Sequence, residues 1–219
     1  MVNKSMILIK FQEEKYVKDL LDGKIYMNRL EYFTKKEEID GDQVIGDLYE
    51  NCTVSNAYET PSGTPCRLIL ENNYNMSYAY CLYGEYLEAN HEIVFEQKDK
   101  LKTFGDTALC IYNVDEFLRR VEKAASKEKY ELVTDWITYY DVEQPNTIEM
   151  MENEIAHNTK AFLKRNEYAY QKEFRIIINQ SYDENGADHI ELNIGSISDI
   201  SEVIGTEDLL SGKIRLKRS

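Results

Sequence analysis

Strand-like runs and amphipathic helical segments alternate along this chain. Residues 5–11 form an apolar run typical of a strand, and residues 13–22 then place Val17 and Leu20 on one helical face that ends at Gly23. Further strand patterns lie at 24–28, 107–112, 131–141, 168–179, 189–194 and 200–204, and helical spacing at 29–38, 92–103 and 146–164. This alternation predicts an α+β fold, with a mixed, mainly antiparallel sheet and flanking helices.

The connections between these segments indicate one domain spanning residues 1–219. The chain has only three prolines, and no Gly/Ser-rich tract or block of charge divides it. Residues 40–47 read as an acidic loop, residues 48–86 as tyrosine-rich antiparallel strands, Asn113 as the N-cap of a helix, and the basic end at 213–218 as an edge strand.

Charge and cysteine usage exclude several classes of protein. A formal charge of -14 disfavours direct binding to duplex DNA or to an anionic membrane, since both interactions depend on Lys and Arg. The four cysteines form no C-x-x-C pair, which argues against a zinc site, and no run is long and apolar enough for a membrane span. We therefore expect no metal, reduced thiols and a cytoplasmic location.

The segment from Tyr168 to Arg175 carries the strongest chemical signal. If it is a strand, alternation puts Glu173 and Arg175 on one face, opposite Phe174. One interpretation is an ion pair on a half-solvated strand. The other is a site in which Glu173 meets a ligand hydroxyl or a developing positive charge and Arg175 binds an anionic group.

Two aromatic segments supply further candidates. Asn28 and Arg29 offer polar groups where a strand ends, and Tyr32 can stack on a planar ring, although aromatic residues here also suit a core. Tyr83 belongs to a tyrosine-lined run at 78–84. Cys81 in the same run becomes a candidate nucleophile only if a distant histidine such as His157 approaches it.

The order of these segments resembles an uncharacterised family of bacterial and phage domains. The matching stretches are 11–28, 80–82, 105–109, 200–205 and the aromatic-x-x-Glu-x-Arg strand at 170–175. That family is distantly similar to ADP-ribosyltransferase folds that modify nucleic acid, in which a glutamate at a strand start steers attack on the nicotinamide riboside of NAD.

The resemblance implies specific roles. Glu173 would be the catalytic glutamate, Asn28 and Arg29 would lie near the adenosine half of NAD, and Tyr32 or Tyr83 would stack on nicotinamide. Two departures favour a relative that binds without catalysis. Asn28-Arg29-Leu30 stands where the family has Asn-Asp-Pro, and Tyr83 stands where it has tryptophan.

The sequence thus leaves three hypotheses. The first is a nucleotide-handling enzyme of the ADP-ribosyltransferase type that uses NAD. The second is a non-catalytic phage or mobile-element protein that binds a host or defence protein through its acidic, tyrosine-rich surface. The third is a protein that sequesters a nucleotide signal in the same pocket.

Overall fold

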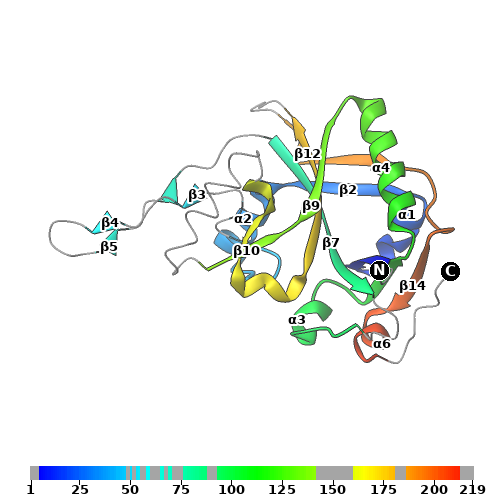
Figure 1. Ribbon diagram of the computed structural model, residues 1–219, viewed down its shortest axis with the longest axis horizontal. Helices are drawn as coiled ribbons and strands as arrows, with labels where there is room; N and C mark the ends of the chain where they lie inside the picture. Colours follow the sequence, from blue (N-terminus) through cyan, green and yellow to red (C-terminus); the bar gives the residue numbers. More distant parts are fainter. Residues whose placement is uncertain are drawn as a thin grey trace.

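The computed structural model describes residues 5–47, 50, 76–87, 93–141, 160–180 and 186–212, with four two-residue strands between 53 and 70. Its centre is an eight-stranded sheet with antiparallel pairs (Figure 1). The main path is β13 (His189–Asn193), β2 (Lys24–Arg29), β7 (Met76–Leu87), β1 (Ser5–Gln12), β8 (Thr107–Ile111) and β14 (Ser201–Gly205). β12 (Glu173–Gln180) pairs with β7 and with β9 (Glu131–Trp136). With the flanking helices, this sheet confirms the predicted α+β class.

Smaller elements complete the described structure. β10 (Thr138–Tyr140) pairs in parallel with β11 (Leu163–Arg165), and two short ladders join β3 (Thr53–Val54) to β6 (Ile69–Leu70) and β4 (Tyr58–Glu59) to β5 (Pro65–Cys66). The α-helices are α1 (Val17–Leu21), α2 (Leu30–Asp40), α3 (Lys98–Lys102), α4 (Val114–Glu128) and α6 (Thr206–Leu210). Three 3₁₀ turns are η1 (Glu14–Tyr16), η2 (Lys160–Phe162) and η3 (Asn166–Gln171).

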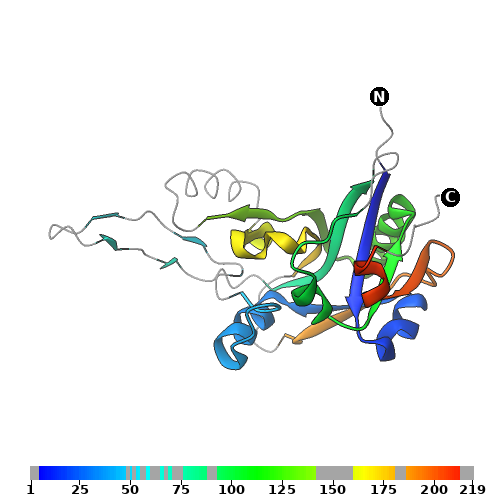
Figure 2. The same ribbon diagram turned by 90° about the horizontal axis from the view of Figure 1, so that it is seen from below.

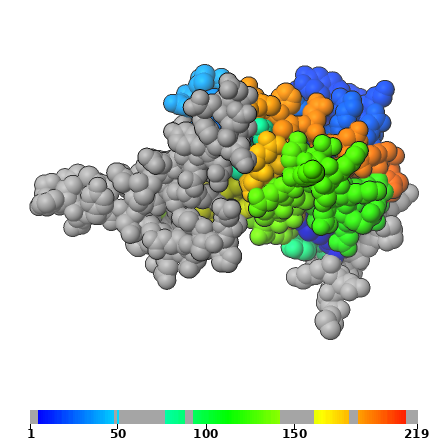
Figure 3. Space-filling view, turned by 90° about the horizontal axis from the view of Figure 1, so that it is seen from above, coloured from blue at the N-terminus to red at the C-terminus, as the bar shows by residue number. Residues whose placement is uncertain are grey.

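Helix α4 covers one face of the sheet. Asn113 caps it as predicted, because its side-chain oxygen accepts the Glu116 backbone N–H at 3.2 Å. The helix buries a stripe at helical spacing against β1, β7 and β12, made of Val114, Phe117, Val121 and Ala125. The green atoms of α4 form a continuous surface in the space-filling view (Figure 3).

The opposite face is divided into two apolar clusters. One gathers residues of β1, β7 and β8 with α3 and α6, including Ile9, Phe11, Tyr83 and Leu101. The other contains Leu30 from α2 with residues of β7, β12 and the 160–163 segment. In Figure 2, α4 and α1 lie on one side of the dark blue strand β1, and α2 and α3 lie on the other. Polar side chains from β12 and β11 lie at the division, as described below.

The sheet forks along β7. β12 occupies one edge of β7 from residue 76 to residue 83. On the other edge, β2 pairs with residues 78–79 and β1 with residues 83–87. In the described ladders residues 80–82 pair with β12 alone, because β1 turns toward β8 and β2 toward β13. A gap therefore opens between β1 and β2.

Most of the predicted strands are confirmed within a residue or two at their ends. These are the strands expected at 5–11, 24–28, 107–112, 189–194 and 200–204, observed as β1, β2, β8, β13 and β14. The helix expected at 29–38 is α2, and the one at 13–22 is the pair η1 and α1. Gly23 ends α1 with a φ of 84°, in the left-handed region where glycine is favoured.

Four element predictions need correction. The helix expected at 92–103 is only α3, because Phe95 packs onto Tyr83 and the helix starts after Gln97, which has a φ of 44°. The strand expected at 131–141 breaks into β9 and β10. The bend at Ile137 brings Tyr139 to β12, where its hydroxyl accepts the Glu173 backbone N–H at 2.9 Å.

The strand expected at 168–179 starts only at Glu173, since residues 166–171 form η3. The helix expected at 146–164 falls largely on residues 142–159, outside the described residues, and its last residues form η2 and β11 instead. The predicted basic edge strand at 213–218 also lies outside the described residues. Within the described ranges, no helix has the length and apolar character needed to span a bilayer.

Candidate functional site

A cavity of about 350 Å³ lies at the fork of the sheet. Its volume falls within the range of small-molecule sites, roughly 300–1,000 Å³. β1, β2 and β7 supply its walls at the fork, α2 and α3 close its sides, and β11, η3 and β12 contribute polar groups. The lining residues with polar groups are Lys10, Gln12, Tyr16, Tyr26, Asn28, Tyr32, Cys81, Tyr83, Lys164, Gln171 and Glu173, and the others are apolar and include three phenylalanines.

Four of the six predicted site residues line this cavity. Asn28 reaches it from β2, Tyr32 from α2, Tyr83 from β7 and Glu173 from the start of β12. Tyr83 also belongs to the apolar cluster, where its ring packs 5.2 Å from Phe95. The structure therefore brings together residues as far apart as positions 28 and 173.

The two predicted arginines do not line the cavity. Arg29 precedes α2 and lies 3.4 Å from Glu31. The Arg175 side chain is 1% exposed and points to carboxylates of the protein itself. The structure thus places both arginines against carboxylates of the chain, and their expected role in binding the ligand stays a prediction.

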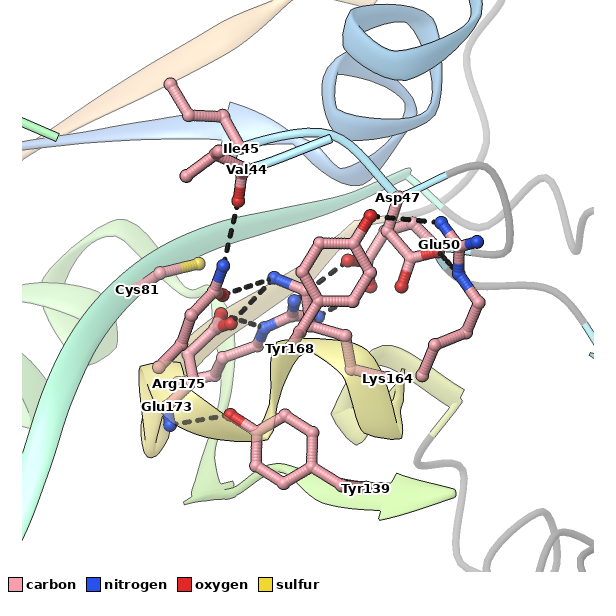
Figure 4. Close-up of polar contacts among 12 residues, drawn as sticks. Val44, Ile45, Asp47, Glu50, Cys81, Tyr139, Lys164, Tyr168, Glu173 and Arg175 are labelled. Carbon is pink, nitrogen blue, oxygen red and sulfur yellow. Dashed lines mark hydrogen bonds and ion pairs between the residues drawn. The ribbon is translucent and has the colours of Figure 1, made fainter. Parts of the chain in front are cut away.

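Arg175 holds together a buried charge cluster (Figure 4). Its terminal nitrogens donate to both oxygens of Glu50, at 2.6 and 2.8 Å, and one of them also donates to the Ala161 carbonyl at 2.5 Å. Its Nε donates to Glu173 at 2.5 Å. Burial alone would lower the pKa of the Arg175 guanidinium, but Glu173 and Glu50 outweigh it and raise the pKa well above its ordinary value. Arg175 is therefore a fixed positive charge that holds the Glu173 carboxylate in place.

Glu173 lies between two buried cations. One carboxylate oxygen accepts from Arg175, and the other accepts from Lys164 Nζ at 3.0 Å. Burial alone would raise the pKa of Glu173, but Arg175 and Lys164 outweigh it and hold the pKa well below its ordinary value. The carboxylate is therefore ionised at neutral pH.

Lys164 is fixed by the same arrangement. Its ammonium also donates to Gln171 Oε1 at 2.8 Å, and Gln171 Nε2 donates to the Val44 carbonyl at 2.8 Å. Burial alone would lower the pKa of Lys164, but Glu173 outweighs it and the pKa lies above its ordinary value. Lys164 thus remains a cation in the cavity wall.

Lys10 adds a second ammonium to the lining. It donates to the Cys81 carbonyl at 2.9 Å, at the point where β7 has no ladder partner from β1 or β2. Burial lowers its pKa below the ordinary value, against the opposing influence of Cys81 and Glu173. Counted formally, two lysines against one carboxylate give the lining one net positive charge, in a chain whose formal charge is -14.

Two further polar atoms in the lining residues have no hydrogen-bond partner among the described residues. These are the buried Gln12 Nε2 and the Tyr83 hydroxyl. Because a buried polar group without a partner is costly, such atoms mark places where water or a ligand completes the hydrogen bonding.

The Cys81 thiol is not a nucleophile at neutral pH. Burial and then Glu173 raise its pKa to about 12, despite Arg175, Lys10 and Lys164. His157, the partner that the sequence offered, lies outside the described residues. Across the described ranges, no group of three or more His, Cys, Asp or Glu residues could hold a metal ion.

Arg165 forms ion pairs with the acidic loop at residues 40–47 and with α2, beside the cavity. Arg165 donates to Asp47 at 2.8 Å and to Glu37 at 2.5 Å, which ties β11 to α2 and to the loop after it. Ile45 from that loop lines the cavity. The acidic residues near position 47 are therefore partly internal and not simply a solvated surface.

Sequence reasoning missed several lining residues. Lys10 carried a usable signal, because it is a lone charge inside the apolar run from Ile7 to Phe11. Lys164 and Gln171 carried none, since they fell inside a predicted helix and a predicted strand. No local pattern pointed to Glu50 either, because its part in the site is an ion pair with Arg175, 125 residues away.

No protein family, curated protein or solved structure matches this chain.

Proposed function

We propose that this protein binds a nucleotide of the NAD type in the cavity at the fork of the sheet and acts on it as an ADP-ribosyltransferase-like enzyme. One observation supports this above the others. A strongly acidic chain encloses a cavity whose lining is net positive and rich in tyrosine, and Glu173 stands at its buried end.

The lining matches the chemical parts of a nucleotide. Lys10 and Lys164 are cations suited to phosphate oxygens, and Asn28 and Gln12 offer amide groups to hydroxyls. Tyr26 and Tyr32 offer flat faces to a planar ring. This combination fits a ligand that carries negative charge, hydroxyl groups and a heterocycle together.

In this proposal Glu173 stabilises positive charge. When the glycosidic bond between C1′ of the ribose and the nicotinamide nitrogen breaks, its electron pair leaves with nicotinamide and positive charge develops on the ribose. An ionised carboxylate held in place by Arg175 and Lys164 stabilises that charge without rearranging. The acceptor's lone pair forms the new bond to C1′, and the acceptor's proton passes to solvent.

The test is turnover of NAD by Glu173 variants. Purified protein is incubated with NAD, and released nicotinamide is measured by chromatography. We expect Glu173→Gln and Glu173→Asp to lose at least about 100-fold in turnover, the usual scale for removing an electrostatic stabiliser. Glu202→Gln is a matched control, because Glu202 is an exposed carboxylate on β14 that does not line the cavity.

Glu173→Asp keeps the negative charge between the two cations, so it separates loss of chemistry from loss of fold. Melting temperatures of all variants are recorded alongside turnover. Wild-type turnover of NAD that survives both substitutions would remove Glu173 from the chemistry, and the absence of nicotinamide release by the wild type would remove the enzymatic part of the proposal.

Binding without turnover is the second candidate function, and the ion pairs of Glu173 with Arg175 and Lys164 favour it. Both of its oxygens already accept from protein cations, which is also what a purely structural ion pair requires. A screen of melting temperature against NAD, ATP, ADP-ribose and cyclic nucleotides, followed by chromatography of each mixture, separates the two. A shift with the nucleotide recovered intact would support a sequestering protein.

A further inference from the structure

Exposed tyrosines gather at one end of the cavity. Among the described residues, eight large hydrophobic side chains are exposed, and three of them line the cavity. These are Tyr16, Tyr26 and Tyr32, which are 51%, 48% and 37% exposed. Exposed aromatic surface concentrated around a cavity is unusual for a solvated face and marks a binding site.

The three tyrosines come from three different elements, and neighbouring side chains hold two of the rings. Tyr16 ends η1, Tyr26 lies in β2 and Tyr32 lies in α2. The Tyr26 ring stacks on His189 across the β2–β13 ladder, with centroids 4.3 Å apart. Tyr32 meets Phe33 edge-on at 5.4 Å. Rings held in this way lose little entropy when a ligand stacks on them.

The cavity is therefore polar at its buried end and aromatic at its exposed end. Glu173 and Lys164 are each 4% exposed, and Gln171 is 7% exposed. The tyrosines at the other end are the lining residues in greatest contact with solvent. A ligand that fits both ends carries its charged group inward and a planar ring outward.

We propose that Tyr16, Tyr26 and Tyr32 form a stacking subsite for the heterocyclic ring of a nucleotide at the mouth of the cavity. The ligand's anionic group then points inward, toward Lys10 and Lys164. This inference rests on the proposed nucleotide-binding function and adds to it the orientation of the ligand and the residues that recognise its ring.

A cation is a poorer occupant of the same rings. Lys15 Nζ already lies 4.8 Å from the Tyr16 ring centroid, and Lys36 Nζ lies 5.7 Å from that of Tyr32. A further positive group would meet these ammonium groups at the mouth and Lys10 deeper in the cavity. A neutral ring attached to an anionic group is repelled neither by the ammonium groups at the mouth nor by Lys10.

The experiment compares a ligand that carries planar heterocyclic rings with one that carries only a sugar and a phosphate. Calorimetric titrations with NAD and with ribose 5-phosphate are carried out on wild type, Tyr26→Leu and Tyr32→Leu. Tyr112→Leu is the matched control, since Tyr112 is 37% exposed like Tyr32 but does not line the cavity. We expect each cavity substitution to weaken NAD binding roughly tenfold and to leave ribose 5-phosphate within about twofold of wild type.

The outcomes separate this inference from the proposed function. If wild type binds NAD and the cavity variants bind it as tightly as Tyr112→Leu does, the stacking subsite is refuted while nucleotide binding stands. An equal loss for NAD and ribose 5-phosphate also refutes it, because the tyrosines would then not act on the ring. If wild type binds neither ligand, both proposals fall together. Because the tyrosines are exposed, unchanged melting temperatures are expected for all three variants.

Discussion

Replacing Arg175 with methionine is expected to destabilise the fold by about 3–5 kcal/mol, the usual cost of removing one partner of a buried ion pair. The structure supports the upper part of this range. The guanidinium is 1% exposed, and it donates to both oxygens of Glu50, to Glu173 and to the Ala161 carbonyl. Methionine preserves much of the volume but leaves the fully buried Glu50 carboxylate without its cation.

The measurement is urea denaturation followed by circular dichroism. For a chain of this size, 3–5 kcal/mol corresponds to a fall in melting temperature of about 6–20 °C. Arg119→Met is the control, because Arg119 makes an equally short bidentate pair with Glu116, at 2.7 Å for both contacts, but its side chain is 61% exposed. Solvent screens that pair, so its loss should change stability little.

A double-mutant cycle with Glu50→Leu tests the cause. Replacing both partners by apolar groups removes the unpaired charge, so the double variant should be destabilised by at least about 1 kcal/mol less than the sum of the single variants. If Arg175→Met costs no more than Arg119→Met, or if the cycle shows no coupling, the argument that a desolvated ion pair fixes Glu173 is wrong.

Three further perturbations test other parts of the structure. Cys81 should react with iodoacetamide at about pH 8 at least 100-fold more slowly in the native protein than in urea, since burial raises its thiol pKa to about 12; mass spectrometry of the labelled peptide gives both rates. Lys129→Gly should raise the free energy of unfolding by about 0.5–1 kcal/mol, because Lys129 ends α4 with a φ of 62°, and equal or lower stability in urea would contradict this. Because the folded pKa of Glu173 lies below its ordinary value of 4.5, its ionisation stabilises the fold above that pH, and this stability is lost as the pH falls toward the folded pKa. Glu173→Gln should therefore show a weaker loss of stability between about pH 5 and about pH 3 than wild type, and parallel curves for the two proteins would refute the assignment.

Local patterns predicted the elements whose formation depends on near neighbours. The apolar run at 5–11 and the Asn113 cap each predicted an observed element, the strand β1 and the start of helix α4. The pattern failed at residues 92–103, 131–141 and 168–179. In the first two cases a side chain contacts a distant strand, as Phe95 does with Tyr83 and Tyr139 with Glu173. Tertiary packing there overrides local propensity.

The candidate site also combines a feature that local patterns predict with one that depends on distant residues. Alternation along β12 placed Glu173 and Arg175 on one face, and the ion pair between them follows from that spacing. The expectation of a half-solvated strand was wrong, since both side chains are buried. Burial arises from Glu50 and the 160–164 segment, which cover this face and which no local pattern linked to it.

The sequence by itself determined the α+β class, most strand positions and the shared face of Glu173 and Arg175, because period-2 and period-3.6 patterns are set by residues a few positions apart. Only the tertiary structure decided that β1 and β2 diverge along β7, that Lys10 and Lys164 flank the resulting cavity, and that Arg175 turns away from it. Those outcomes depend on which strands pair and on which charges are removed together from water. Such choices are made between distant residues, 51 positions apart for Asn28 and Ala79 and 125 for Glu50 and Arg175, where local patterns carry no information.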